Sequence, residues 1–129
     1  MNFGYYPGCS LSGTAKEFDL SLKEVLKNLA TDLQEINDWS CCGASSAHSA
    51  SHLLAVALPA RNLILAKEQG MKEVVAPCAA CFNRLKVAQH ELKTDEHLRT
   101  KTEELLDTKY SNGLEVLNLI SLFQQIGLE

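Results

Sequence analysis

The cysteines are the residues of this chain whose types and spacing could do chemistry. There are five of them, spaced as C-x31-C-C-G-x34-C-x2-C: Cys9, Cys41, Cys42, Cys78 and Cys81. Neighbouring side chains point in different directions, so adjacent thiolates cannot easily share one tetrahedral ion, but they can bind two irons of one cluster. Gly43, directly after the adjacent pair, would let the backbone approach a bulky group closely.

Four roles for the cysteines can be weighed against this pattern. A cysteine often packs simply as a small hydrophobe, which would explain one or two thiols but not all of them. Zinc would take four ligands and leave one thiol over. A redox dithiol at Cys78 and Cys81 would be activated by a helix N-terminus, but the other thiols would stay unexplained. An iron–sulfur cluster, whose usual ligands are thiolates, is the interpretation that uses every cysteine.

Composition limits the class of protein. The chain has 129 residues, 46% of them hydrophobic and 22% charged, which fits one globular domain with a usable core. A net charge of −4 gives no electrostatic basis for binding nucleic acid. The first residues do not form a secretory signal, and no apolar run approaches the length of a membrane span. An odd number of cysteines argues for a reducing compartment, so we expect a cytoplasmic location.

Apolar patterns predict strands that alternate with helices. The strands are expected at 2–6, 34–37, 73–76 and 114–117. The helices are expected at 14–31, 49–57, 82–92, 94–106 and 119–126, with another started or kinked by Pro59 and capped by Gly70. The first helix is predicted to be amphipathic, with apolar residues at helical spacing: Phe18, Leu22, Val25, Leu26 and Leu29. The core is expected to rest on Leu22, Leu26, Ile64, Val74, Val75 and Leu85.

This alternation predicts an α/β fold, a single layered domain with a small, mostly parallel sheet flanked by helices. Each group of cysteines comes just after a predicted strand. In open α/β sheets, sites gather outside the carboxyl ends of the strands. We therefore expect cysteine loops at the carboxyl ends of the strands, with all five sulfurs in one pocket.

Two runs of residues carry a resemblance to a known family. They are Tyr5-Tyr6-Pro7-Gly8-Cys9-Ser10 and Trp39-Ser40-Cys41-Cys42-Gly43-Ala44-Ser45-Ser46-Ala47-His48. Together with Cys78-Ala79-Ala80-Cys81, they resemble the cysteine-rich CCG domain of the B-type subunit of heterodisulfide reductase and its relatives, over nearly the whole chain. The resemblance implies a non-cubane 4Fe–4S cluster whose ligands are Cys9, Cys41, Cys42, Cys78 and Cys81.

The same resemblance implies an activity and partners. The activity is reduction of a disulfide substrate, with electrons from a C-type iron–sulfur subunit of the reductase and, beyond it, from its A-type flavoprotein. The catalytic residues would be Cys41 and Cys42, because bonding to two irons would leave one iron able to open a coordination site. Family members usually carry the motif twice, so we expect residues 1–129 to be a single CCG domain, the N-terminal half of a longer two-domain protein.

Two other functions stay open from the sequence. One is an electron-relay module of a quinone-linked or lactate- or glycolate-oxidising complex. The other is a zinc-stabilised structural domain. His48, near the cysteine pair, could donate a hydrogen bond or a proton, although capping of the following helix is favoured. His52 is expected to be structural, and Trp39 is expected to pack as core at the rim of the site.

Overall fold

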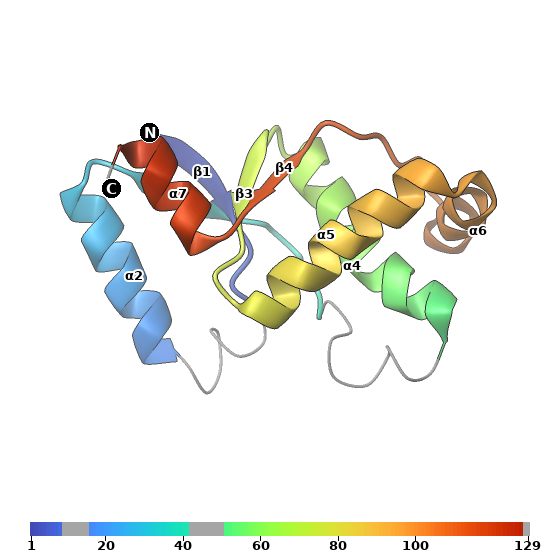
Figure 1. Ribbon diagram of the computed structural model, residues 1–129, viewed down its shortest axis with the longest axis horizontal. Helices are drawn as coiled ribbons and strands as arrows, with labels where there is room; N and C mark the ends of the chain where they lie inside the picture. The colour runs from blue at the N-terminus through green and yellow to red at the C-terminus, as the bar shows by residue number, and fades with distance from the viewer. Residues whose placement is uncertain (9–15, 42–50, 128–129) are drawn as a thin grey trace.

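The computed structural model describes residues 1–8, 16–41 and 51–127 (Figure 1). Four strands form one sheet: β1 (Asn2–Tyr5), β2 (Asp32–Glu35), β3 (Glu73–Val75) and β4 (Glu115–Leu117). The helices of the described residues are α2 (Lys16–Asn28), α4 (His52–Glu68), α5 (Ala79–Thr94), α6 (Glu96–Leu106) and α7 (Leu119–Ile126). Every helix in these three ranges is too short or too polar to serve as a membrane span.

The sheet has the order β2-β1-β3-β4, and every pair of neighbouring strands is parallel. Parallel neighbours need crossover connections, and helices provide them here: α2 between β1 and β2, α4 between β2 and β3, and α5 with α6 between β3 and β4. The predicted α/β class is therefore confirmed, and the sheet is wholly parallel.

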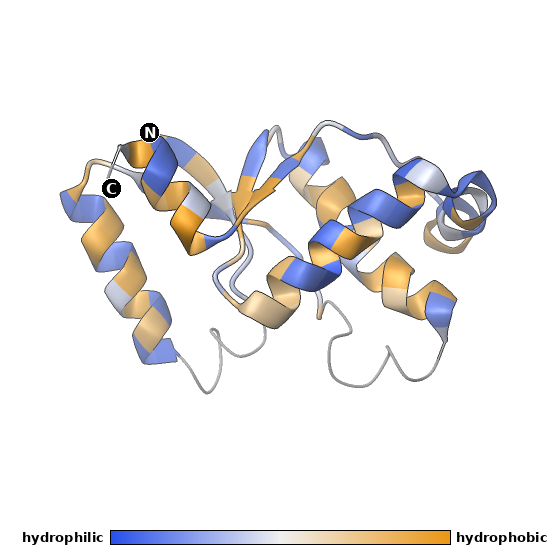
Figure 2. Cartoon of the chain, in the orientation of Figure 1, coloured by the Kyte–Doolittle hydropathy of each residue, from blue (hydrophilic) through white to orange (hydrophobic). Residues whose placement is uncertain are grey.

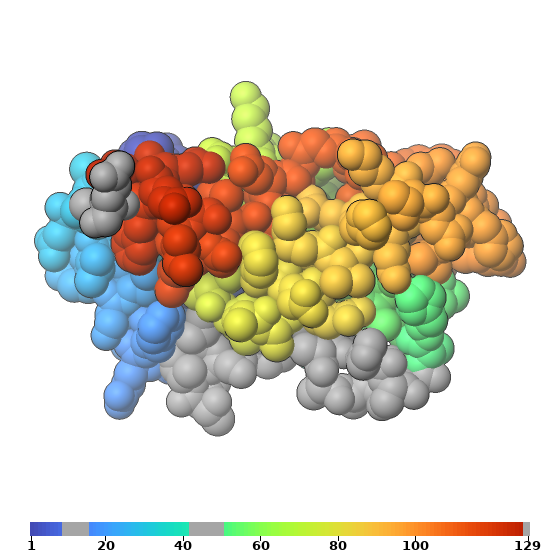
Figure 3. All heavy atoms as spheres, in the orientation of Figure 1, coloured from blue at the N-terminus to red at the C-terminus, as the bar shows by residue number. Residues whose placement is uncertain are grey.

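Alternating side chains of the strands form a core on each face of the sheet. Phe3, Tyr5, Val75 and Leu117 pack with residues of α2 and α7, whereas Val74 and Val116 pack with residues of α4 and α5. From left to right, Figure 1 shows the layer of α2 and α7, then the sheet, then the layer of α4 and α5. Figure 3 shows β4 between α7 and α5. Figure 2 shows that α4 is hydrophobic along most of its length, whereas α6 is largely hydrophilic. The predicted core residues are all buried: Leu22, Leu26, Ile64, Val74, Val75 and Leu85.

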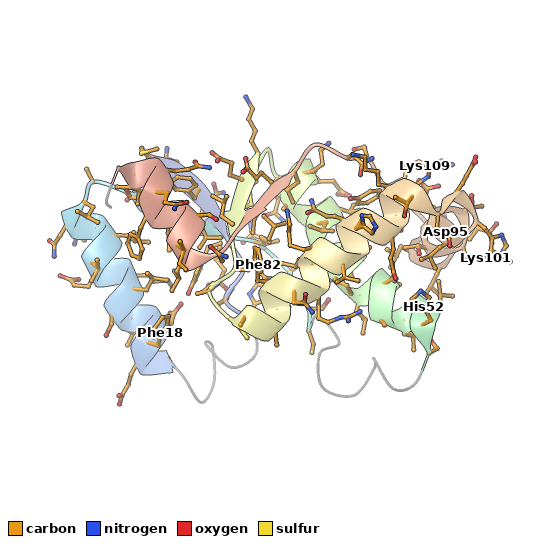
Figure 4. All side chains as sticks on the ribbon, viewed as in Figure 1. Phe18, His52, Phe82, Asp95, Lys101 and Lys109 are labelled. Atoms are coloured by element: carbon orange, nitrogen blue, oxygen red, sulfur yellow. The ribbon has the colours of Figure 1, made fainter. Side chains whose placement is uncertain are left out.

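The buried face of α2 is narrower than the apolar face that the sequence predicts. Leu22 and Leu26 are buried together with Asp19, at helical spacing of three and four residues. Phe18 and Val25 are each 47% exposed, so they lie at the margin of this face instead of inside it. Figure 4 labels Phe18 on α2. The buried face of α2 therefore includes the polar residue Asp19 in place of its apolar neighbour Phe18.

Pro59 neither ends nor starts a helix. It lies inside α4, which runs unbroken from His52 to Glu68. A proline has no N–H, so the carbonyl oxygen four residues earlier, on Ala55, lacks the donor that it would have in a regular helix. The Nη2 of Arg84 in α5 donates to that oxygen at 3.2 Å. A side chain from the neighbouring helix thus supplies the hydrogen bond that the sequence pattern could not foresee.

A buried hydrogen bond ties the first turn of α2 to the end of β1. The hydroxyl of Tyr5, which is fully buried, donates to the Oδ1 of Asp19. Lys23 pairs with the other oxygen of Asp19 at 3.2 Å, and its Nζ lies 5.4 Å from the centre of the Tyr5 ring. Burial raises the pKa of Tyr5, and the Asp19 carboxylate raises it further. In the sequence, Tyr5 and Asp19 flank the stretch that contains Cys9, so the bond holds together the two described segments on either side of it.

Tyr5→Phe is expected to lower the free energy of unfolding by about 1.5–3 kcal/mol, the usual contribution of a hydrogen bond to a charged group. It should also change the pH dependence. Tyr5 stays protonated in the folded chain but ionises in the unfolded chain above about pH 10, so the stability that it provides is complete below that pH and falls above it. Urea unfolding at about pH 8 and 10.5 should show a smaller loss in Tyr5→Phe than in the wild type. An equal loss in both would contradict the assignment to Tyr5, since the pKa of Tyr110 is also raised by burial.

Candidate functional site

The carboxyl ends of three neighbouring strands lead into the cysteine segments. Hydrogen bonds beyond the strand ends keep these three segments together: Ile36 N donates to Tyr5 O at 3.0 Å, and Tyr6 N donates to Val75 O at 2.9 Å. Cys9 follows β1, Cys41 follows β2, and Cys78 follows β3. Because β1 lies between β2 and β3, the segments with these cysteines leave the sheet from adjacent positions. The first turns of α2, α4 and α5 lie along the same lower edge in Figure 1.

The segment after β1 lies directly against a cysteine of α5. A Cβ built on Gly8 would be 2.7 Å from the Sγ of Cys81, closer than real Cβ atoms come to their neighbours. Gly8 also has φ +75°, a conformation that side chains disfavour. Glycine is therefore required here on two grounds, and the residue before Cys9 is in contact with the thiol of Cys81.

Cys78 and Cys81 lie on the first turn of α5. Cys78 is the N-cap residue and is half-buried, and its carbonyl accepts from Phe82 N at 2.8 Å. Cys81, three residues later on the same side of the helix, is 6% exposed and packs with the core. Figure 4 marks Phe82 on this turn. In the structure no disulfide bond joins Cys78 to Cys81.

Cys41 ends a turn that side chains hold in place. Ser40, the residue before it, accepts at its carbonyl oxygen from the hydroxyl of Tyr6 at 2.7 Å and from Asn62 Nδ2 at 2.8 Å. Trp39 packs edge-on against the ring of Tyr6, with centroids 5.3 Å apart, as its predicted role in the core requires. The side chain of Cys41 itself is exposed.

These thiols suit an iron–sulfur cluster by their chemistry and by their place in the fold. Three segments with cysteines start from neighbouring strands, and thiolates are the usual ligands of such clusters. Within 1–8, 16–41 and 51–127, no three His, Cys, Asp or Glu side chains lie close enough to share one metal ion. Cys9, Cys42 and His48 fall outside the described residues. A common pocket for all five sulfurs therefore stays a prediction.

A family comparison agrees with the arrangement of cysteines. The model of the family described as "Cysteine-rich domain" (CCG) matches residues 3–86, which include all five cysteines. The chain belongs to the cysteine-rich domain family. The resemblance noted from the sequence is thus confirmed, and the matched span runs from β1 into α5, the part of the CCG domain that builds the candidate site.

Curated relatives of this CCG domain are named as subunits of reductases. One, at 33% identity over 126 residues, is the 8-methylmenaquinol:fumarate reductase membrane anchor subunit of Wolinella succinogenes, with 95% of this chain and 43% of the relative aligned. Another relative is a protein of Archaeoglobus profundus that is named as like the B-type subunit of heterodisulfide reductase. It is 25% identical over 134 residues, and the alignment covers 100% of this chain and 44% of the relative. A third relative comes from Methanosarcina acetivorans and is the B-type subunit of the ferredoxin/F(420)H(2)-dependent CoB-CoM heterodisulfide reductase. It is 26% identical over 129 residues, and the alignment covers 96% of this chain and 43% of the relative. The chain spans less than half the length of these relatives.

Two residues near the CCG site were not singled out from the sequence. Asn62 is 1% exposed and bonds to the backbone next to Cys41, and Tyr6 bonds to the same residue. A signal for Asn62 was present, because it is a lone amide inside the apolar stretch of α4. The Nε2 of His52, a residue expected to be structural, lies 3.4 Å from the Oε2 of Glu91 in α5.

Proposed function

We propose that this chain is the iron–sulfur redox domain of a protein like the B-type subunit of heterodisulfide reductase, which transfers electrons to a disulfide substrate. The observation that supports it most directly is the departure of three cysteine-bearing segments from adjacent strand ends, with Gly8 pressed against Cys81. Two curated relatives that are named for this subunit of heterodisulfide reductase add to the support.

In this proposal the ligands of a non-cubane 4Fe–4S cluster are the thiolates of Cys9, Cys41, Cys42, Cys78 and Cys81. When bound, the cluster would supply the one-electron steps needed to reduce a disulfide, a couple that takes up two electrons and two protons in total and yields two thiols. The protein would hold the two sides of the site differently. Cys81 is buried in the core, which restricts water there, whereas Cys41 is exposed and leaves its side open to a substrate or partner.

A second candidate is an electron-relay module without a disulfide substrate. The relative from Wolinella succinogenes has the highest identity of the three described above, 33%, and its name couples a menaquinol to a fumarate reductase. By analogy, the CCG domain would pass electrons between a quinone-linked protein and a partner. The same cysteines would hold the cluster, so the two candidates differ in the electron acceptor and not in the ligands.

The proposal extends to the assembly. We propose that residues 1–129 are one domain of a longer two-domain protein, because the relatives are more than twice as long as the part that aligns. Its partners would be a C-type iron–sulfur subunit of the reductase and an A-type flavoprotein, in the cytoplasm. Nucleic acid is not proposed as a partner, since the chain has a net charge of −4.

Anaerobic reconstitution with iron and sulfide is the direct test of the proposal. We expect the chain to bind iron and acid-labile sulfide in a ratio near one to one, as thiolate-bound clusters contain them. Bound zinc without sulfide would instead support a structural zinc domain and contradict the proposal. Adding a disulfide to the reduced, loaded protein should change its electron paramagnetic resonance signal. An unchanged signal would favour the relay function.

A further inference from the structure

The turn before Cys41 is held by side chains of α4 in place of a neighbouring strand. β2 ends at Glu35, and the last sheet-type hydrogen bond on this side is from Ile36 N to Tyr5 O. From Asn37 to Ser40 the backbone has left the sheet, so its N–H and C=O groups need other partners. Residues of α4 and its C-cap provide them.

Two amide side chains bind this backbone in the same two-point manner. Asn62 Oδ1 accepts from Ser40 N at 2.9 Å, and Asn62 Nδ2 donates to Ser40 O at 2.8 Å. Gln69 Oε1 accepts from Asn37 N at 2.9 Å, and Gln69 Nε2 donates to Asn37 O at 3.0 Å. An amide carries a donor and an acceptor side by side, so each side chain satisfies both backbone groups of one residue, as a strand would.

Arg61 completes the attachment between these two points. Its guanidinium donates to Asp38 O at 2.8 Å and to the Asp38 carboxylate at 2.7 Å. Asp38 has φ 64°, a left-handed conformation that aspartate tolerates better than most residues but that still costs free energy. The bonds from Arg61 stabilise that conformation, which turns the chain toward Cys41.

Asn62 differs from Gln69 and Arg61 in how far it is buried. Asn62 is 1% exposed, whereas the bonds of Gln69 and Arg61 are exposed to solvent. Hydrogen bonds shielded from water cost more to break, because the separated groups cannot be hydrated easily. The buried hydroxyl of Tyr6 reaches the same carbonyl of Ser40 at 2.7 Å. Ser40 is therefore the most firmly held residue of the turn, and it is covalently joined to Cys41.

We propose that Asn62, assisted by Tyr6, is a positioning residue that fixes the place of the Cys41 thiol in the candidate site. This inference rests on the proposed function for its consequence, since a misplaced Cys41 would bind a cluster poorly. Tyr6 lies two residues before Gly8, which contacts Cys81. The bond from Tyr6 to Ser40 therefore also links the segment that leads to Cys9 with the segment that leads to Cys42.

The first test uses the full chain without metal. In Asn62→Leu, which keeps the side chain similar in size, we expect exchange of the Ser40 amide hydrogen to accelerate about tenfold, as loss of partly buried hydrogen bonds of ordinary strength predicts. Alkylation of Cys41 by iodoacetamide, followed by peptide mass spectrometry, should become about threefold faster, while alkylation of Cys78 stays unchanged. Tyr6→Phe, which keeps the ring against Trp39, should change both rates in the same direction by a smaller factor.

Leu63→Ala is the matched control. Leu63 is the next residue of α4, is 3% exposed and packs in the core, so its truncation destabilises the fold without touching Ser40. We expect it to lower the melting temperature while leaving the ratio of the Cys41 and Cys78 alkylation rates as in the wild type. Equal Ser40 exchange or equal Cys41 alkylation in Asn62→Leu and Leu63→Ala would overturn the inference.

The second test follows anaerobic reconstitution of the same variants. Asn62→Leu should bind about tenfold less iron and sulfide at limiting iron, or give an altered electron paramagnetic resonance signal, as loss of a supporting residue does in metal sites. Normal loading with an unchanged signal would overturn the positioning role. If the wild type itself binds no iron and sulfide, the proposed function fails, and the placement of Cys41 is decided by the exchange and alkylation rates alone.

Discussion

Cys41→Ala is expected to remove most of the iron and sulfide that the chain binds after anaerobic reconstitution, by about tenfold or more at limiting iron. The thiol is exposed and ends a turn held by backbone contacts at Ser40, so alanine removes a proposed ligand without opening a cavity. The fold should therefore persist, with a melting temperature close to that of the wild type. Iron and sulfide analysis together with a circular dichroism melt measures both effects on one sample.

Two further variants make this result specific. In Cys81→Ala the thiol lost is 6% exposed and packs in the core, so we expect both the bound iron and the melting temperature to fall. In Ser40→Ala the hydroxyl lost has no hydrogen-bond partner among the described residues, and the bonds of Ser40 use backbone atoms, so both quantities should stay near the wild type. Full loading of Cys41→Ala would remove Cys41 from the ligand set.

Gly8→Ala is expected to destabilise the fold by about 2–5 kcal/mol. The left-handed conformation at φ +75° costs a side chain about 1–2 kcal/mol. The added methyl group would also lie 2.7 Å from the Sγ of Cys81, and such overpacking costs about 1–3 kcal/mol more. Urea unfolding of the chain without metal measures the sum.

Gly70→Ala separates the two contributions. Gly70 has φ +83°, and a Cβ there would meet nothing within 4 Å, so only the conformational cost of about 1–2 kcal/mol applies. The difference between the two variants is the cost of the contact with Cys81. Similar losses in both would mean that the thiol moves aside freely, and Gly8 would then lose its part in the site.

The sequence predicted the architecture because the signals for it are local. Runs such as Val74 and Val75 before a proline, or Leu119 to Ile126 after a strand, encode strand and helix by their own composition, and both lie where predicted. The strand order β2-β1-β3-β4 depends on pairing between distant segments, which no local pattern encodes. The start of β2 at Asp32 was missed by two residues, because its edge position lets it be mostly polar.

The candidate site was only partly visible in the sequence. The cysteines could be recognised by type and spacing, and their place after strands followed from the fold. Among the supporting residues, Asn62 stood out only as a lone amide in an apolar stretch. The supporting roles themselves could not be predicted, because they arise from contacts across the chain: Asn62 and Ser40 are 22 residues apart, and Tyr6 and Ser40 are 34 apart. The exposure of Phe18 was missed for the same reason, since the buried face of α2 is set by the bond between Asp19 and Tyr5.

The proline in α4 makes the effect of one substitution depend on another. Arg84 is needed at the carbonyl of Ala55 because Pro59 has no N–H to offer it. Any other residue at position 59 would restore an intrahelical donor, and the guanidinium would then compete for an acceptor already in use. The two changes are therefore non-additive. If Arg84 were replaced first in evolution, the carbonyl of Ala55 would lose its donor. If Pro59 were replaced first, Arg84 could change later at little cost. The order of the two substitutions therefore decides whether the intermediate protein is destabilised.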